Sequence, residues 1–162
     1  MYLTMSLVSL IERNAEALTK RWLEIVRIHP NTPTYHRWDE RQLYARVFKV
    51  YSNLGQSISE RTTRQDIERE YIELGHQRHA EGFALSEVIQ ALIISRRVLW
   101  LKIEADGFLN TALDLNLALE LNNKVVLFFD RAIHYTALGY EEAARAPHAE
   151  APHARGAESR HN

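Results

Sequence analysis

Residues 111–144 constrain the fold of this chain more than any other segment, because they carry one continuous helical periodicity. On a helical wheel the polar residues of this segment fall within an arc of roughly 120°, and apolar residues line most of the remaining arc, which is roughly 200° wide. A helix that packs against one core needs an apolar stripe of only about 100°. The sequence therefore predicts a long helix with apolar surface for two partners.

Four further helical segments precede this one, and no segment shows the alternation of a half-buried strand. They span about residues 4–28 and 40–60, followed by a helical pair over 66–105 that is broken at Gly82. Long helices joined by short loops are typical of an all-α domain. We expect one domain over residues 1–145, built as a bundle of about five main helices.

Capping residues mark two of the predicted helix starts. In each case a threonine precedes an aspartate by three residues, the spacing of a capping box. The pairs are Thr63 with Asp66, for which Thr62 is an alternative cap, and Thr111 with Asp114. These residues predict where the third and fifth helices begin.

Residues 146–162 differ from the rest of the chain. They contain APHAE followed directly by APHAR, and no large apolar residue. Such a composition cannot offset the entropy of ordering the chain, so we expect a disordered tail. Its histidines, His148, His153 and His161, suggest metal scavenging, but a solvated tail is the interpretation we favour.

Composition excludes several classes of function. The chain has no cysteine, which rules out disulfides, thiolate zinc sites and cysteine nucleophiles. The longest apolar run, residues 125–129, is far shorter than the ~20 residues of a membrane span, and the N-terminus lacks the pattern of a signal peptide. Twenty basic residues against 21 acidic ones create no positive field for nucleic acid. We expect a cytoplasmic protein with neither a nucleic-acid nor a membrane partner.

Two arginines interrupt the apolar stripes of the helical pair. Arg78 shares its face with Ile67, Tyr71 and Leu74, and Arg96 shares its face with Leu85, Ile89, Leu92, Leu99, Trp100 and Ile103. An arginine that faces a core keeps its charge and must meet a carboxylate, backbone carbonyls or a bound anion, or reach water. Positions of this kind are where function tends to lie.

Two hypotheses explain Arg78 and Arg96. In the first, they form a cationic pocket between the paired helices that binds a small anion or carboxylate ligand. In the second, they form internal ion pairs. The candidate partners are Glu73, Glu81, Glu87 and Asp114. We favour ion pairs, because an unpaired buried charge is costly.

The surplus apolar surface of the last two helices predicts a homodimer. The helix over 85–105 has a second apolar arc, formed by Ala91, Ile94, Val98 and Leu101. The predicted interface residues are Ile94, Val98, Leu101, Leu115, Leu119, Val126, Phe129 and Ile133. An isologous two-fold contact would bury them. The alternative is that the first two helices cover this surface within one subunit.

Residues 71–89, YIELGHQRHAEGFALSEVI, and residues 96–100, RRVLW, resemble the N-terminal domain of the RsbT co-antagonist (RsbRD) family. The shared pattern is LG, two residues, R, three residues, G, then LxE and a helix that carries R and LW. The resemblance implies a globin-like domain without haem that dimerises through its last two long helices and acts in stressosome-type bacterial signalling. In that family an output module such as a STAS or kinase domain usually follows the domain. Because a tail without large apolar residues stands at that place in this sequence, we expect a signalling partner of that type in trans.

The same region resembles the proximal helix of haem-carrying globin-coupled sensors, where glycine, two residues and histidine supply the haem ligand. In this chain Gly75 is followed at that spacing by Arg78, and His79 comes one residue late. One residue rotates a helical side chain by roughly 100°. We therefore expect no haem and no other cofactor.

Two further clusters have the spacing of metal-binding or catalytic residues. Glu73 and His76, with His79 beyond them, have the Glu-x-x-His spacing of carboxylate-bridged di-iron bundles, but only one copy lies in the helical region. Asp130 and His134 are four residues apart, as an oriented general base would be, but an i,i+4 surface pair also explains them. We expect no metal site and no catalytic residue. The predicted function is a non-catalytic sensory or regulatory domain, and the alternative is a ligand- or metal-binding bundle with haem or di-iron chemistry.

Overall fold

The computed structural model describes residues 2–106 and 111–146, and over these residues the chain is helical with no strand. The helices are α1 (Tyr2–Arg13), α2 (Ala15–Val26), α3 (Glu40–Ser52), α4 (Leu54–Ser57), α5 (Arg64–Ala80), α6 (Leu85–Ala105) and α7 (Ala112–Arg145), with a 3-10 turn η1 (Pro33–His36) between α2 and α3. The predicted all-α fold class is confirmed. Beyond Ala146, the predicted disordered tail lies outside the described residues.

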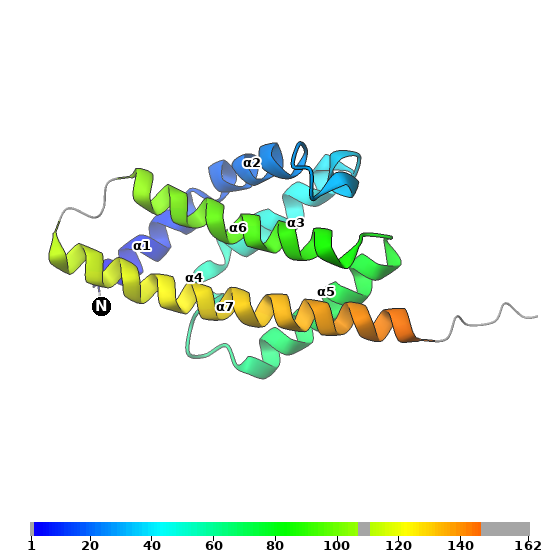
Figure 1. Ribbon diagram of the computed structural model, residues 1–162. Helices are drawn as coiled ribbons and strands as arrows, with labels where there is room; N and C mark the ends of the chain where they lie inside the picture. Colours follow the sequence, from blue (N-terminus) through cyan, green and yellow to red (C-terminus); the bar gives the residue numbers. More distant parts are fainter. Residues whose placement is uncertain (1, 107–110, 147–162) are drawn as a thin grey trace, which may run out of the picture.

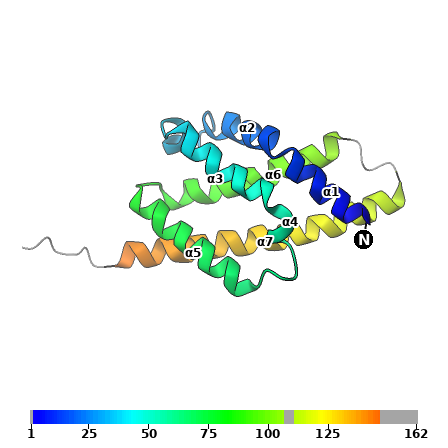
Figure 2. The ribbon, with the colours of Figure 1, turned by 180° about the vertical axis from the view of Figure 1, so that it is seen from behind.

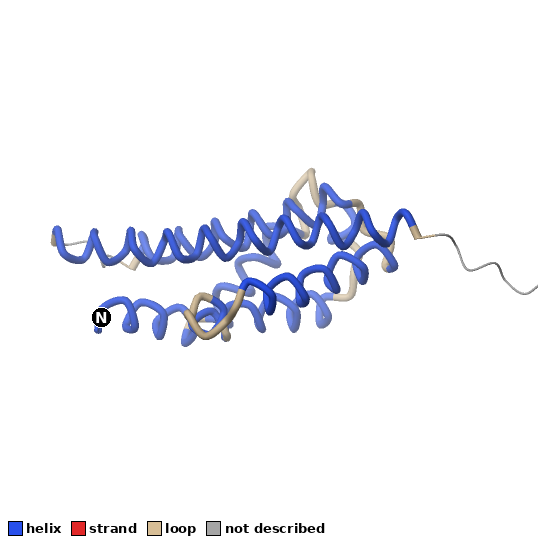
Figure 3. Tube along the Cα trace, turned by 90° about the horizontal axis from the view of Figure 1, so that it is seen from below, coloured by secondary structure: helices blue, strands red, loops and turns tan. Residues whose placement is uncertain are grey.

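The helices form two layers. Antiparallel helices α6 and α7 lie side by side on the face toward the viewer in Figure 1. Figure 2 shows α1, α3, α4 and α5 on the opposite face. Figure 3 gives the edge-on view, in which the N-terminal helix lies in the layer away from α7. One side of the α6–α7 layer is therefore covered by the rest of the chain.

Two predicted helices are each divided into two at an asparagine. The segment 4–28 breaks at Asn14, whose side-chain amide donates to the Leu10 carbonyl at 2.8 Å, and the segment 40–60 breaks at Asn53. Asparagine is a poor residue for a helix interior because its side chain competes for backbone hydrogen bonds. The apolar periodicity continues across both breaks, which is why it predicted single helices.

Both predicted capping boxes are present. The Asp66 N–H donates to the Thr63 hydroxyl at 3.1 Å, and the Thr63 N–H donates back to the Asp66 carboxylate at 2.9 Å. That backbone hydrogen bond is the main reason why the pKa of Asp66 is lowered from its usual value. Thr111 and Asp114 make the same reciprocal pair at 3.1 and 3.2 Å. The starts of α5 and α7 are thus fixed by local sequence.

Two glycines let α5 and α7 meet backbone to backbone. A Cβ atom added to Gly75 would stand 2.5 Å from the Tyr140 nitrogen and closer still to the Thr136 carbonyl oxygen. A Cβ atom added to Gly139 would stand 2.8 Å from the Ile72 carbonyl carbon. Neither position has room for a side chain, so hydrogen is the only group that fits at this crossing.

Replacing either crossing glycine should separate the two helices. We expect Gly75→Ala and Gly139→Ala each to lower the free energy of unfolding by about 3 kcal/mol, because the added methyl group meets rigid backbone. The control is Gly82→Ala, because an added Cβ atom there has no heavy atom within 4 Å. The φ of Gly82 is 85°, so the left-handed backbone conformation alone should lower the free energy of unfolding, by about 1 kcal/mol. Urea denaturation followed by circular dichroism measures all three. Equal midpoints for the three variants would contradict the close crossing.

Candidate functional site

A cleft of about 1250 Å³ opens between α3 and α5 and reaches α6. Its apolar lining comes from Leu43, Val47 and Val50 on α3, Leu74 on α5, and Val88, Ala91 and Leu92 on α6. The rest of the lining is largely polar and includes the buried residues Tyr35, Tyr71 and Arg78 together with Arg46. Concave surfaces that combine apolar walls with buried polar groups are the usual form of a small-molecule site.

Arg78 lies at the inner side of this cleft and is only 5% exposed. Its guanidinium donates to Glu81 Oε1, while Glu81 Oε2 accepts from Arg46 Nη2 at 2.7 Å. The expected internal ion pair of Arg78 is therefore present, with Glu81 as the partner. The sequence analysis did not predict Arg46 of α3 as a site residue. Like Arg78, it is an arginine close to apolar residues of its own helix, here Leu43 and Val47.

The Arg46–Glu81–Arg78 cluster carries two positive charges and one negative charge. Desolvation, and then the charge of Arg46, lower the pKa of Arg78 from its usual value against the opposing effect of Glu81. Arg46 Nη1 is buried and has no hydrogen-bond partner among the described residues. The Arg46 guanidinium also lies 6.0 Å from the ring of Trp38. The cluster is thus left with one excess positive charge and one free donor.

Tyr35 and Tyr71 add two phenol groups to the cleft. Both residues are buried, and desolvation is the main cause that raises the pKa of each hydroxyl group. Both phenols are therefore neutral at physiological pH and keep their protons. Tyr35 stands in η1, a turn without apolar periodicity, so no sequence signal marked it.

Arg96 lies elsewhere. It does not line the cleft; its side chain is 33% exposed, and its Nη1 atom lies 3.4 Å from Asp130 Oδ1 on α7. Asp130 was not among the predicted carboxylate partners, and the expected i,i+4 pair of Asp130 with His134 is not formed. The structure therefore does not bring Arg78 and Arg96 into one pocket.

The position of Arg96 follows from the face that α6 turns to the core. The sequence suggested that the Arg96 stripe faces inward, but the buried side of α6 takes residues from both arcs: Ala91, Ile94 and Val98 from the second arc, and Leu99 and Ile103 from the Arg96 stripe. Trp22 Nε1 donates to the Ala91 carbonyl at 3.0 Å, which anchors α2 on the second arc. Both arcs are apolar, so periodicity alone could not show that the core would take part of each.

The predicted interface residues divide into two groups. Ile94, Val98 and Phe129 are buried within the subunit. The others are exposed or half-buried: Leu101, Leu115 and Leu119 are each 46% exposed, and Val126 and Ile133 are half-buried.

The remaining candidates occupy polar positions. His76 Nε2 lies 3.1 Å from Glu142 Oε2 on α7, and Glu73 is largely exposed. The His79 ring packs edge-on against Tyr140, with 5.0 Å between centroids, and does not line the cleft. Within residues 2–106 and 111–146 no group of three or more metal-binding side chains comes together.

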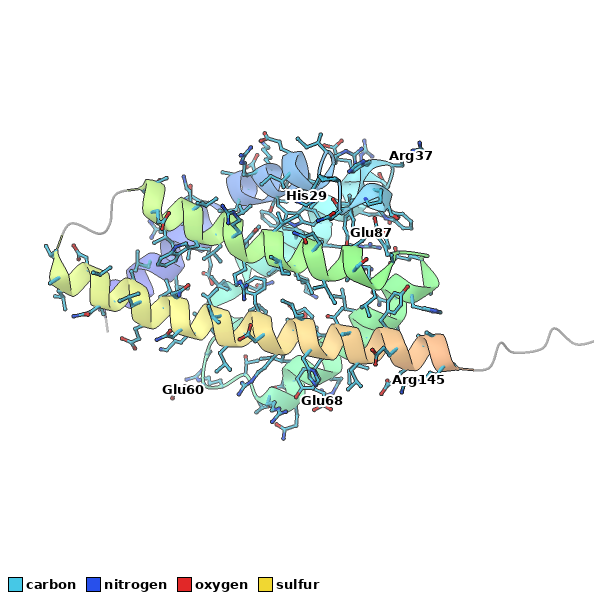
Figure 4. All side chains as sticks on the ribbon, in the orientation of Figure 1. His29, Arg37, Glu60, Glu68, Glu87 and Arg145 are labelled. Carbon is cyan, nitrogen blue, oxygen red and sulfur yellow. The ribbon has the colours of Figure 1, made fainter. Side chains whose placement is uncertain are left out.

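Glu87, another proposed arginine partner, has a structural role instead. Its carboxylate accepts from the Thr34 N–H at 2.6 Å and the Thr34 hydroxyl at 2.7 Å, and from the Ala84 N–H at 3.2 Å. Figure 4 labels Glu87 near the start of α6, beside the segment that leads from α2 to α3. Glu87 therefore ties η1, and with it Tyr35, to the start of α6.

With this geometry established, comparison with known proteins identifies the family. The family model described as "RsbT co-antagonist protein rsbRD N-terminal domain" matches residues 16–155. The chain belongs to this family, whose members are stressosome-type regulatory sensor domains. Neither a search of curated proteins nor a search of solved structures gave a match. Among the described helices, none has the length and apolar character needed to cross a membrane.

Loss of the bridging carboxylate should destabilise the fold. We expect Glu81→Gln to lower the free energy of unfolding by about 2 kcal/mol, because two neighbouring guanidinium groups lose their shared counter-charge. The matched control is Glu16→Gln, which removes one partner of the exposed Glu16–Lys20 pair and should leave the urea midpoint unchanged. A Glu81→Gln midpoint equal to that of the wild type would show that the cluster does not stabilise this cleft.

Proposed function

We propose that this chain is a non-catalytic sensory domain that acts by forming a homodimer and by contacting a second signalling protein in the cytoplasm. Membership of the RsbT co-antagonist N-terminal family supports the regulatory role. The observation that carries the dimer is an apolar surface on α6 and α7 that the rest of the subunit leaves partly uncovered.

This surface, the α6–α7 face, is defined by residues at helical spacing on the outer side of the layer. Its members are Ile89 and Ile93 on α6, and Leu115, Leu119, Val126 and Ile133 on α7. All six are half-buried or exposed, and they flank the Arg96–Asp130 ion pair. Apolar residues gathered on one face mark an interaction site, and a two-fold axis would set each copy of the face against the other.

The Arg96–Asp130 ion pair suggests how the α6–α7 face transmits a structural change. Arg96 and Asp130 link α6 to α7 beside apolar residues, and a second copy of the chain that covered this face would exclude water from the ion pair and strengthen it. A change in the relative position of the two helices would alter this link and the packing of both subunits. Packed interfaces have discrete arrangements, so a small shift can become a switch. A STAS-type or kinase-type partner in trans would receive that change.

One charge placed on the α6–α7 face should separate the subunits. We expect Leu119→Glu to convert a dimer into a monomer, because two carboxylates would be buried near the axis. Light scattering during size exclusion measures the mass, and circular dichroism checks the fold.

The matched control for this experiment is Leu113→Glu. Leu113 is on the same helix and 62% exposed, but it lies roughly 120° around α7 from Leu119, so this variant should remain a dimer. A wild-type chain that stays monomeric at high concentration, or a Leu119→Glu variant that stays dimeric, would overturn the proposed interface.

A further inference from the structure

We propose that the cleft between α3 and α5 binds a small monocarboxylic acid, with its carboxylate on Arg46 and Arg78 and its apolar body along the cleft walls. The inference deepens the proposed function by naming the class of ligand. It depends on that function only for the consequence of binding, because binding itself needs nothing from the α6–α7 face.

The charge of the site selects an anion. Glu81 neutralises one of the two guanidinium groups of the Arg46–Glu81–Arg78 cluster, so one positive charge is left over. The other charged lining residues balance one another, with Lys49, Arg61 and Arg69 against Asp66, Glu70 and Glu73. A monocarboxylate balances that charge, whereas a phosphate dianion would leave a negative excess in a partly desolvated place. Arginine also matches the planar, two-oxygen geometry of a carboxylate.

The hydrogen-bonding groups of the site select an acceptor. Arg46 Nη1 is a buried donor with no partner among the described residues, and a buried donor without a partner costs free energy. The neutral hydroxyl group of Tyr35 is close enough to Arg78 and Arg46 for their charges to act on its pKa, and Tyr71 lines the same cleft with a second neutral hydroxyl group. These groups can donate hydrogen bonds, and a carboxylate is an acceptor-only group.

The walls of the cleft fix the rest of the ligand. Aliphatic side chains form part of the lining, with Leu43 and Val47 on one side and Leu74, Val88 and Leu92 on the other, whereas most of the remaining lining residues are polar or charged. Small-molecule sites have volumes of about 300–1,000 Å³, and the cleft exceeds this range because it is open to solvent. An alkyl or aromatic group of several carbons would cover aliphatic surface that water now contacts.

The structure also connects the cleft to α7. The Arg78 carbonyl accepts from the Phe83 N–H at 3.1 Å, and the Phe83 carbonyl accepts from the Tyr140 hydroxyl at 2.6 Å. Glu81, the counter-ion of the cluster, lies in the same turn between α5 and α6. A carboxylate that competes with Glu81 for Arg78 would therefore act on the turn that contacts α7.

Calorimetric titration of the full chain tests the proposal. The probes are straight-chain carboxylates from butanoate to decanoate, with octylammonium and 1-octanol as matched cationic and neutral compounds. We expect saturable binding of one octanoate per chain, at least tenfold tighter than binding of either control compound. If no carboxylate of the series saturates a single site, or if octylammonium or octanol binds as tightly as octanoate, the proposal is wrong.

Two variants locate the binding. Arg46→Gln should weaken octanoate binding at least tenfold, whereas Arg41→Gln, an exposed arginine on the same helix, should not change it. Equal affinity for wild type and Arg46→Gln would overturn the site. If Arg46→Gln does not fold, amide chemical shifts of the wild type replace it: octanoate should perturb α3 and the C-terminal half of α5, and perturbation confined to other helices would also overturn the site.

The same titration on Leu119→Glu separates this inference from the proposed function. Leu119 does not line the cleft, so we expect octanoate to bind this variant with wild-type affinity. Binding in a chain that never dimerises would support the cleft and refute the dimer. A chain that dimerises but binds no carboxylate would support the dimer and refute the ligand site.

Discussion

The backbone contact between α5 and α7 is the constraint on which the rest of the structure depends. Gly75 and Gly139 allow the two helices to approach until no side chain fits between them. Because α5 is held against α7 in this way, it stands apart from α3, and the cleft opens between α3 and α5. Arg78 follows Gly75 by less than one turn, so the same contact fixes where its guanidinium meets Glu81.

The fold places two surfaces with different chemistry on either side of one helical layer. The α6–α7 face is apolar around the Arg96–Asp130 ion pair, and it is the surface that we propose binds a second copy of the chain. The cleft on the other side combines aliphatic walls with a cluster that carries one excess positive charge. The turn at Glu81–Phe83 joins them, because it contains the counter-ion of the cluster and accepts a hydrogen bond from Tyr140 on α7. If the two proposals hold, this turn would connect the input site of the sensory domain to its output surface.

Local sequence determined much of this fold, and long-range packing determined the remainder. Capping pairs, the Gly82 turn and the long periodicity of α7 act over a few residues, and the sequence predicted them correctly. The ion pair of Arg78 was also predictable, because Glu81 is only three residues away. Arg46 and Asp130 join their partners from distant helices, and no local pattern encodes such a pairing. The buried side of α6 was not predictable for the same reason, because it takes residues from both apolar arcs and is set by packing against distant helices.

The most direct test of this account is a distance measurement between two subunits. The chain has no cysteine, so a single spin label can be attached at Asn123→Cys, an exposed position roughly 40° around α7 from Leu119, or at Arg41→Cys in the opposite layer. The account predicts a resolved dipolar distance between two labels at position 123 that disappears on dilution with unlabelled chain, and a longer or unresolved one between labels at position 41. A short distance between the labels at position 41 with none between those at position 123 would contradict it.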